Sequence, residues 1–297
     1  MSATLPPPPP PVAGHVPTLD VSGTPRTPFT RLIGVEWRKM LDTRAGVWLL
    51  GITAGLLALI AGIVLLIVAL ADVSPPSAND WLNILTIPVS MLVPVMAITI
   101  VTQEWSQRTA MVTFALESSR LRVVLAKLVA VMALGAATIL LALVLGLIGN
   151  IIGAGLAGTD ANWNVTASTF GWAMATQVLY LLMGFGFGLL LLSSPAALAL
   201  YYVYVWILEG GVIIPGIMYV LWIAFDWGQA ILPWFSMRIA MLPFQIGDSD
   251  AASLENDLGA NLDTGALGLA HVFTSVLIWV GLPLVLGTIR LLRAEVK

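Results

Sequence analysis

Charged side chains gather in one stretch of this chain, residues 103–127, with the sequence QEWSQRTAMVTFALESSRLRVVLAK. The stretch carries two carboxylates and four cations, although charged residues make up only 10% of the chain. Glu104 lies four residues before Arg108, and Glu117 lies three residues before Arg120, which are spacings that allow ion pairs along a helix. We expect a short amphipathic helix here, ended at Ser118-Ser119, where a serine can also cap the helix that follows.

A second candidate for chemistry is Glu209, a lone carboxylate in the apolar run VYVWILEGGVIIPG. A charge at the centre of a bilayer costs about 2.5–3.5 kcal/mol, so such a group usually faces protein or water. We expect Glu209 to face the interior of the protein. Two roles stay open: it lines a transport pathway, or it bonds backbone groups that are freed where Gly210-Gly211 interrupts the helix.

Nucleotide chemistry has no support in the sequence. The chain lacks the motif G-x-x-x-x-G-K-[ST], so it has no P-loop of its own. The motif GFGFG lies inside an apolar run and follows no strand. Its Gly184 and Gly188 have the GxxxG spacing that lets helices approach closely. We expect them to serve packing within one chain, with a seam between two copies as the alternative.

Composition excludes several other classes of function. The chain has 297 residues, of which 59% are hydrophobic, and its mean hydropathy is +0.95. Soluble domains are about 45–50% apolar and about 25% charged, so this composition predicts a multi-pass membrane protein. The absence of cysteine excludes disulfides and thiolate metal sites, and two distant histidines offer no metal cluster. No basic patch that could bind nucleic acid is present.

The elements that must position these residues follow from the apolar runs. We expect an all-α protein: a proline-rich, disordered tail (1–27), an amphipathic helix in the membrane interface (28–44) and a six-span domain (45–297). Each expected span can cross about 30 Å of hydrocarbon, which takes roughly 20 residues. The six are residues 47–71, 81–101, 124–152, 169–192, 196–225 and 267–292. The fifth is too long for one straight span, so we expect a break at Gly210-Gly211 and Pro215, with short outer helices before the sixth span.

Charge placement predicts the orientation. With the N-terminus inside, every one of the 13 Lys and Arg residues except Arg238 falls on the cytoplasmic side. The reversed topology would violate the positive-inside rule. We therefore expect both termini in the cytoplasm and residues 103–123 as the main cytoplasmic loop. That loop could serve only to fix the topology, but the rule leaves its carboxylates unexplained.

The charged motifs resemble those of a known family. Glu104, Arg108-Thr109, Leu116, Ser119-Arg120 and Ala126-Lys127 resemble the pattern E–x3–R–T … L–x2–(S/P)–R … A–K, which follows the second span of type-2 ATP-binding-cassette (ABC) transporter permeases. The segment VEWRKMLDTR is similar to the E–x2–K interfacial helix of that family. The resemblance covers residues 29–297 and leaves out the proline-rich tail and the acidic loop after Gly247.

The resemblance implies a function and partners. The loop after the second span would be the coupling helix, which docks on a separate nucleotide-binding subunit. The candidate coupling residues are Glu104, Arg108, Thr109, Glu117 and Arg120, with Glu36 and Lys39 on the N-terminal helix. ATP and magnesium would be bound by that partner, and this chain would need no cofactor. A second copy or a paralogue would complete an exporter in the plasma membrane, surrounded by lipid.

Two alternatives from other classes remain at this point. One is a membrane-embedded enzyme that modifies lipids, although Glu209 has no histidine or acidic residue beside it in the sequence to form a catalytic group. The other is an accessory membrane protein that transports nothing. The sequence does not identify a transported substrate.

Overall fold

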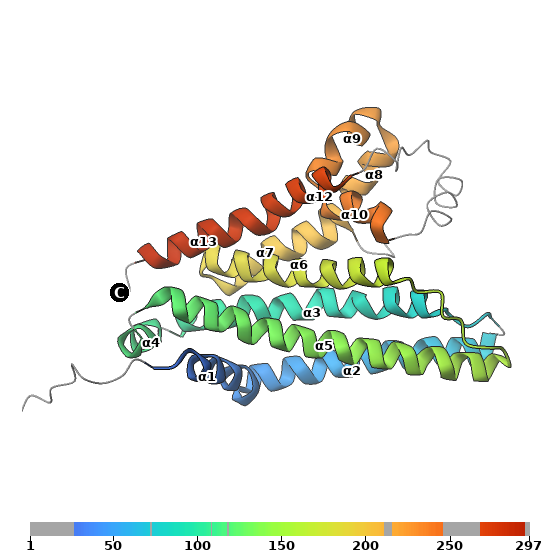
Figure 1. The fold of residues 1–297 in the computed structure, drawn as a ribbon, viewed down its shortest axis with the longest axis horizontal. Helices are drawn as coiled ribbons and strands as arrows, with labels where there is room; N and C mark the ends of the chain where they lie inside the picture. The colour runs from blue at the N-terminus through green and yellow to red at the C-terminus, as the bar shows by residue number, and fades with distance from the viewer. Residues whose placement is uncertain are drawn as a thin grey trace, which may run out of the picture.

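The computed structural model describes residues 27–71, 73–107, 109–117, 119–210, 216–245 and 268–294. Every secondary-structure element within these ranges is a helix, as the composition predicts. The expected proline-rich tail, apart from Thr27, and the acidic loop after Gly247 lie outside the described residues. Figure 1 shows long helices packed side by side, with a group of short helices at one end.

The first two helices are separated by a single residue. Helix α1 (Phe29–Asp42) starts directly after Pro28, which precedes the first helical position instead of occupying it. Thr43 has an extended backbone, and α2 (Arg44–Ala71) begins at the next residue. The break between the two helices thus falls at Thr43.

The next helices form the centre of the bundle. Helix α3 (Ala78–Ser106) begins at a capping box, in which the Ser77 hydroxyl accepts from the Asp80 amide and the Asp80 carboxylate accepts from the Ser77 amide. The short helix α4 (Ala110–Leu116) connects α3 to α5 (Arg120–Ala157), which has 38 residues and ends at Gly158 with a φ of 66°. Helix α3 packs against both α5 and α6 (Ala167–Leu191), and α2 packs on α5 (Figure 1).

The last third of the chain forms shorter helices with more interruptions between them. Helix α7 (Ser194–Tyr202) continues as the π-helix η1 (Val203–Glu209) and ends at Gly210, whose φ of 76° favours glycine. The remaining elements are α8 (Ile217–Ala224), α9 (Asp226–Ile231), the 3-10 turn η2 (Leu232–Trp234), α10 (Met237–Gln245), α12 (Leu269–Val276), the π-helix η4 (Leu277–Gly281) and α13 (Leu282–Arg293).

Among the residues that the structure describes, five helical segments are long and apolar enough to cross a membrane, which is compatible with a multi-pass membrane protein. They are Arg44–Ala71, Ala78–Ser106, Arg120–Ala157, Ala167–Leu191 and Leu269–Arg293. The expected fifth span is not among them, because α7 has only 9 residues and η1 only 7. The expected helix break does occur at Gly210, whereas Gly211 and Pro215 lie outside the described residues.

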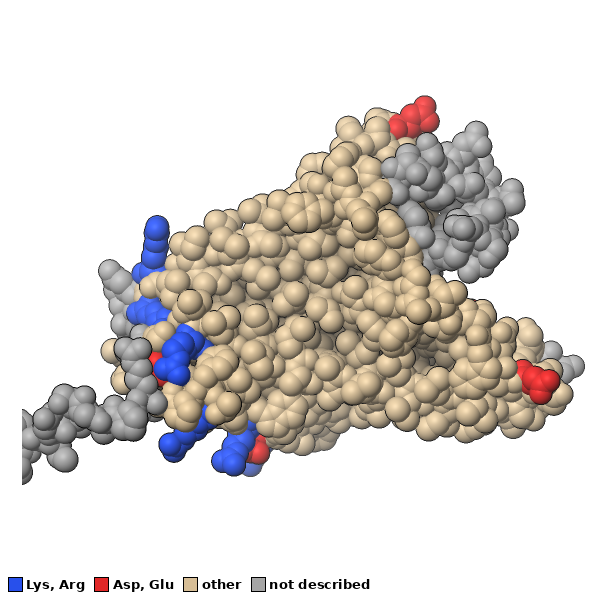
Figure 2. All heavy atoms as spheres, in the orientation of Figure 1, with Lys and Arg blue, Asp and Glu red and all other residues tan. Residues whose placement is uncertain are grey.

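Apolar and charged surfaces are separated as a membrane requires. Large apolar side chains on α2 and α5, such as Leu70, Leu66 and Leu140, are more than half exposed. Lys and Arg side chains gather at one end of the bundle (Figure 2), where α1, α4 and the C-terminal end of α13 lie (Figure 1). Charged residues are thus kept away from the apolar middle of the surface.

Gly184 and Gly188 lie where α6 packs closely on α3. A Cβ atom on Gly184 would come within 2.9 Å of both the Cβ atom and the carbonyl oxygen of Pro94, and one on Gly188 within 3.3 Å of the Ile98 backbone. The GxxxG pair therefore serves helix packing within one chain.

We expect Gly184→Ala to lower the free energy of unfolding by about 1–3 kcal/mol, because the added methyl group would push α6 away from Pro94. Gly171→Ala is the matched control, since it lies on the same helix with nothing within 4 Å of the added atom. The control should be neutral or slightly stabilising. Thermal unfolding in detergent compares the two, and equal melting temperatures would contradict the close packing.

Candidate functional site

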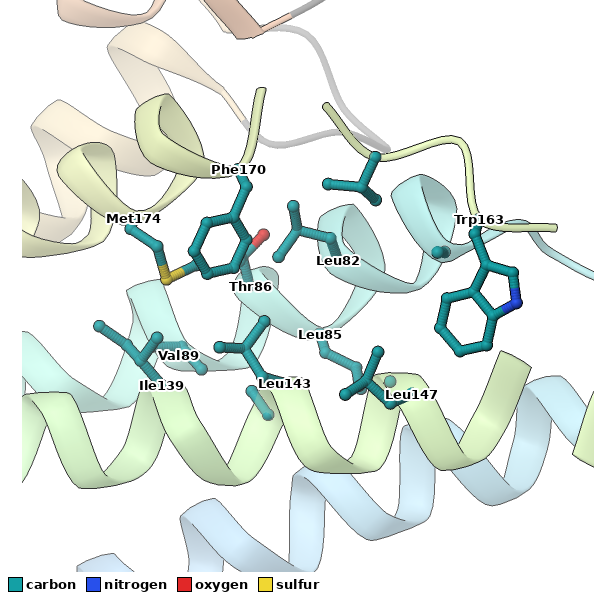
Figure 3. A pocket seen from close by; sticks show the side chains of 14 residues that line it. Leu82, Leu85, Thr86, Val89, Ile139, Leu143, Leu147, Trp163, Phe170 and Met174 are labelled. Carbon is teal, nitrogen blue, oxygen red and sulfur yellow. The ribbon is translucent and has the colours of Figure 1, made fainter. Parts of the chain in front are cut away.

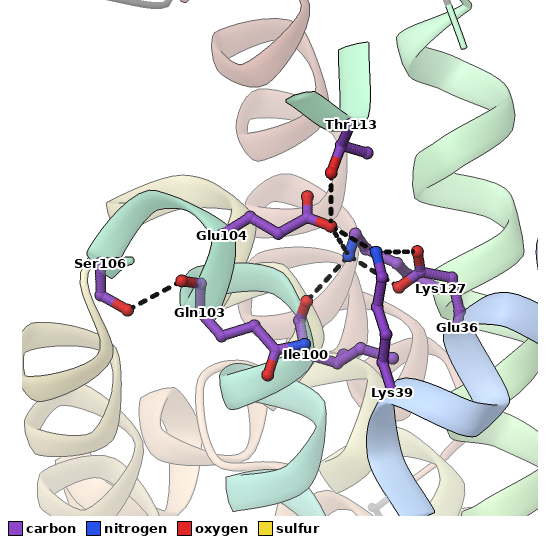
Figure 4. Close-up of polar contacts among 8 residues, drawn as sticks. All are labelled: Glu36, Lys39, Ile100, Gln103, Glu104, Ser106, Thr113 and Lys127. Carbon is purple, nitrogen blue, oxygen red and sulfur yellow. Dashed lines mark hydrogen bonds and ion pairs between the residues drawn. The ribbon is translucent and has the colours of Figure 1, made fainter. Parts of the chain in front are cut away.

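Four charged side chains form a buried cluster at the cation-rich end of the bundle (Figure 4). The Lys39 ammonium lies 2.7 Å from Glu36 Oε1 and 2.8 Å from Glu104 Oε1. The Lys127 ammonium lies 2.8 Å from Glu36 Oε2 and 3.0 Å from Glu104 Oε1. We call these residues the ion-pair cluster; its two carboxylates and two ammonium groups make it electrically neutral.

The cluster connects three helices. Glu36 and Lys39 lie one turn apart on α1, Glu104 lies in the last turn of α3, and Lys127 lies two turns into α5. Lys127 is only 4% exposed and also donates to the carbonyl of Ile100, at 3.1 Å. Each charge therefore has an opposite charge within hydrogen-bond distance, which buried ions need in order to be tolerated.

Lys39 is the most exposed member of the cluster. Burial by itself lowers the pKa of its ammonium group, but the charge of Glu36 and the hydrogen bonds to Glu104 and Glu36 outweigh that effect. The net result is a pKa above the ordinary lysine value. Lys39 therefore stays charged throughout the physiological pH range.

Helix α4 is held beside the cluster by polar contacts. The Thr113 hydroxyl donates to Glu104 Oε1 at 3.1 Å, which ties α4 to the cluster. Glu117, just after α4, pairs with Arg122 at 3.0 Å and accepts from the Ser119 amide at 3.2 Å. The middle of α4 and its C-terminal end are thus attached to the main bundle.

Two arginines connect the start of α5 to the two ends of the described chain. Arg120 donates to the carbonyl of Leu291, in the last turn of α13, at 3.0 Å and to that of Ala294, just after the helix, at 2.6 Å. Arg122 donates to the Thr27 carbonyl, before α1, at 2.6 Å. The loop around α4 therefore contacts the first helix, the last helix and the bundle core together.

The outer face of α4 remains apolar and exposed. Met111 is 58% exposed and Val112 is 61% exposed, and Thr109 and Ala115 are exposed beside them. Met111 and Val112 lie at the charged end of the protein, away from the apolar middle that would contact lipid. An exposed apolar surface in such a place is typical of a protein–protein contact.

The sequence-predicted coupling residues separate into two groups. Glu36, Lys39 and Glu104 are brought together, but they face one another instead of a partner protein. Thr109, Glu117 and Arg120 lie around α4 as expected, and Arg108 lies outside the described residues. Sequence reasoning did not include Lys127 in the cluster, although a lysine inside an apolar run needs a partner.

Two local predictions in this loop were wrong. Glu117 pairs with Arg122 instead of Arg120, because the helix ends at Leu116 and the extended backbone of Glu117 changes the direction of its side chain. Ser119 takes the N-cap position of α5, but its side chain makes no capping bond. Ser118 lies outside the described residues.

Glu209 is buried as expected, at 1% exposure. Its Oε1 accepts from the Tyr204 hydroxyl at 2.5 Å and the Met237 amide at 2.9 Å, and its Oε2 accepts from the Arg238 amide at 2.8 Å. These amides are at the start of α10, so Glu209 attaches the end of η1 to that helix. It bonds a neighbouring helix end, which the sequence did not foresee.

No group of three or more His, Cys, Asp or Glu side chains that could hold a metal ion occurs within the described ranges. Comparison of the chain with models of protein families, with curated proteins and with solved structures gave no match.

Proposed function

We propose that this chain is the membrane-spanning permease subunit of an ABC exporter, in which a separate ATPase subunit binds to α4. The observation that carries the proposal is the exposed apolar face of α4, a helix that Thr113 bonds to Glu104 of the ion-pair cluster and that leads into α5, whose first turn bonds both ends of the described chain. A short, rigidly held helix of this kind can pass on a displacement from a partner without sliding.

The energy source follows from the sequence. ATP and magnesium would be bound by the partner subunit, because this chain has no P-loop. Two copies, or this chain with a paralogue, would enclose the pathway across the plasma membrane.

The proposed coupling mechanism assigns different roles to the two groups of charged residues. Thr109, Met111 and Val112 contact the ATPase directly, whereas Glu36, Lys39, Glu104 and Lys127 hold α4 and α1 to the bundle. A movement imposed on α4 is then transmitted to α1, α3 and α5 as one unit.

The proposal includes six spans with both termini in the cytoplasm, α7 and η1 forming the fifth. We expect reporter enzymes that are active only outside the cytoplasm to be active when fused after Asp160 or after Asp257. A fusion after Thr109 is the control and should be inactive. Silence at both outer positions would contradict this topology.

The docking role of α4 predicts a selective loss of partner binding. We expect Met111→Ser/Val112→Ser to weaken association with the ATPase about tenfold or more, because both side chains would lose apolar contact area. Co-purification of tagged subunits measures the association, and ATP-dependent export measures the coupling.

The matched control is Ile231→Ser, an apolar residue that is 49% exposed on α9, at the opposite end of the protein (Figure 1). It should leave association unchanged. Normal ATPase association and normal export in the α4 double variant would exclude α4 as the docking element.

A further inference from the structure

Two cavities adjoin in the half of the bundle that is distant from the ion-pair cluster. The first, which we call the apolar cavity, has a volume of about 320 Å³ and lies between α3, α5 and α6 (Figure 3). Its walls are almost entirely apolar, with Leu82, Leu143 and Phe170 among the residues around it. The hydroxyl of Thr86, which also lines it, already donates to the Asn83 carbonyl at 2.9 Å.

The second, the polar cavity, has a volume of about 290 Å³ and lies between α3, α6, η1 and α10. Thr86 lines both cavities, so they meet at this residue. The polar cavity is lined by amide and hydroxyl side chains from several helices, which is unusual in the middle of an apolar bundle. They include Asn83, Ser90, Thr169, Thr176 and Gln177.

Two residues that line the polar cavity each have one buried polar atom without a hydrogen-bond partner in the described structure. These atoms are the Oε1 atom of Gln177, a residue only 8% exposed, and the indole Nε1 of Trp206. One is an acceptor and the other a donor. Buried polar groups are nearly always hydrogen-bonded, so an unpaired donor and an unpaired acceptor in two residues that line one cavity favour a ligand that can both accept and donate.

We propose that the two cavities together bind one neutral amphipathic molecule that has a single alkyl chain and a head group with a hydroxyl or amide. The head group occupies the polar cavity, where it donates to Gln177 Oε1 and accepts from Trp206 Nε1. The alkyl chain passes Thr86 and fills the apolar cavity.

The size and chemistry of the cavities limit which molecules can bind there. A cavity of about 150 Å³ accommodates one benzene molecule, so the apolar cavity has room for one alkyl chain but not for two. A carboxylate or an ester cannot donate to Gln177 Oε1, whereas a hydroxyl or amide both donates and accepts. Arg238, which also lines the polar cavity, donates to the Gly210 carbonyl at 2.7 Å.

The route of entry is lateral, from the lipid. Leu147 and Trp163 line the apolar cavity and are 48% and 56% exposed, so its wall reaches the outer surface of the bundle. Trp163 lies in the connection between α5 and α6 (Figure 3), where an indole ring suits the boundary between lipid and water.

Photolabelling of the full chain in phosphatidylcholine nanodiscs tests the proposal. The probe is monolauroylglycerol with a photoreactive group in its acyl chain, and labelled peptides are identified by mass spectrometry. We expect labelling of α3 and α5 around the apolar cavity. Unlabelled monolauroylglycerol should compete at least about tenfold better than methyl laurate or laurate, which lack a donor.

Two substitutions, each with a matched control, locate the site. Leu143→Trp should fill the apolar cavity and abolish labelling, whereas Leu140→Trp, on the lipid-facing side of the same helix, should not. Trp206→Phe should weaken binding about tenfold by removing one hydrogen bond, and the exposed Trp227→Phe should leave it unchanged.

Two results would overturn the inference. If methyl laurate competed as well as monolauroylglycerol, the head group would make no hydrogen bonds that matter for binding. Water would then occupy the polar cavity, and bulk lipid would fill the apolar cavity. Full labelling of both Leu143→Trp and Trp206→Phe would place the probe elsewhere. The assay contains no ATPase, so its outcome is independent of the proposed role of α4.

Discussion

Lys127→Met is expected to lower the free energy of unfolding by about 3–5 kcal/mol. The side chain of Lys127 is 4% exposed and its ammonium contacts both Glu36 and Glu104. Without it, two buried carboxylates share the single charge of Lys39. Chemical denaturation in mixed micelles, followed by circular dichroism, measures the loss.

The matched control is Arg122→Met, on the same helix. Arg122 pairs with Glu117, but its side chain is 26% exposed, so its loss should cost only about 1 kcal/mol. The double variant Glu104→Gln/Lys127→Met should recover part of the stability, because it leaves Glu36 opposite Lys39 with no excess charge. A Lys127→Met variant as stable as Arg122→Met would show that the ion-pair cluster does not hold α1, α3 and α5 together.

Glu209→Leu is expected to cost about 3 kcal/mol or more. The substitution removes the main acceptor of three donors: the Tyr204 hydroxyl and the amides of Met237 and Arg238. Tyr204 and Met237 keep only longer bonds of 3.4 Å, to the Phe235 carbonyl and to the Tyr204 hydroxyl. Each unpaired buried donor costs about 1–3 kcal/mol. Thermal unfolding gives the size of the effect, and limited proteolysis shows whether α10 detaches from η1.

Glu209→Gln should fall between the parent and Glu209→Leu. An amide has one acceptor oxygen, so its NH2 group would face the Met237 or Arg238 amide, and donor would meet donor. Wild-type stability of Glu209→Leu would contradict the anchoring role, whereas wild-type stability of Glu209→Gln alone would show that one oxygen is enough.

The sequence predicted the long helices well because their apolar runs are unmistakable. The helices extend beyond the expected spans: α3 reaches Ser106, past the expected span end at residue 101, and α5 begins at Arg120, before the expected span start at residue 124. The start of α5 directly after Ser119 agrees with the expectation that a new helix follows the serine pair. Hydropathy marks the part of a helix that contacts lipid or core, whereas the hydrogen-bonded turns continue into polar sequence. The candidate site lies on the charged ends of these two helices. The hydropathy pattern left those ends outside the expected spans, so they were expected to belong to the cytoplasmic loop.

The partners within the site were beyond sequence reasoning for a physical reason. Spacing along a helix predicts contacts three or four residues apart, but Glu36 and Lys127 are 91 residues apart and meet only because α1 packs on α5. The same holds for Glu209, whose partners Met237 and Arg238 belong to a separate short helix. Isolated charges in apolar sequence indicated that partners existed, without identifying them.

Helix α5 runs from one end of the protein to the other and can transmit a movement between them. Lys127 of the ion-pair cluster and Leu147 of the apolar cavity both lie on it, and its sequence contains no proline at which it would bend. The twenty residues between them span about 30 Å, so a 5° tilt about Lys127 would shift Leu147 by roughly 2–3 Å. A shift of that size is comparable to the width of a methyl group and would be enough to open or close a narrow cavity wall. A tilt of α5 at the charged end would therefore change how tightly the apolar cavity holds an alkyl chain at the far end, without any bend in the helix itself.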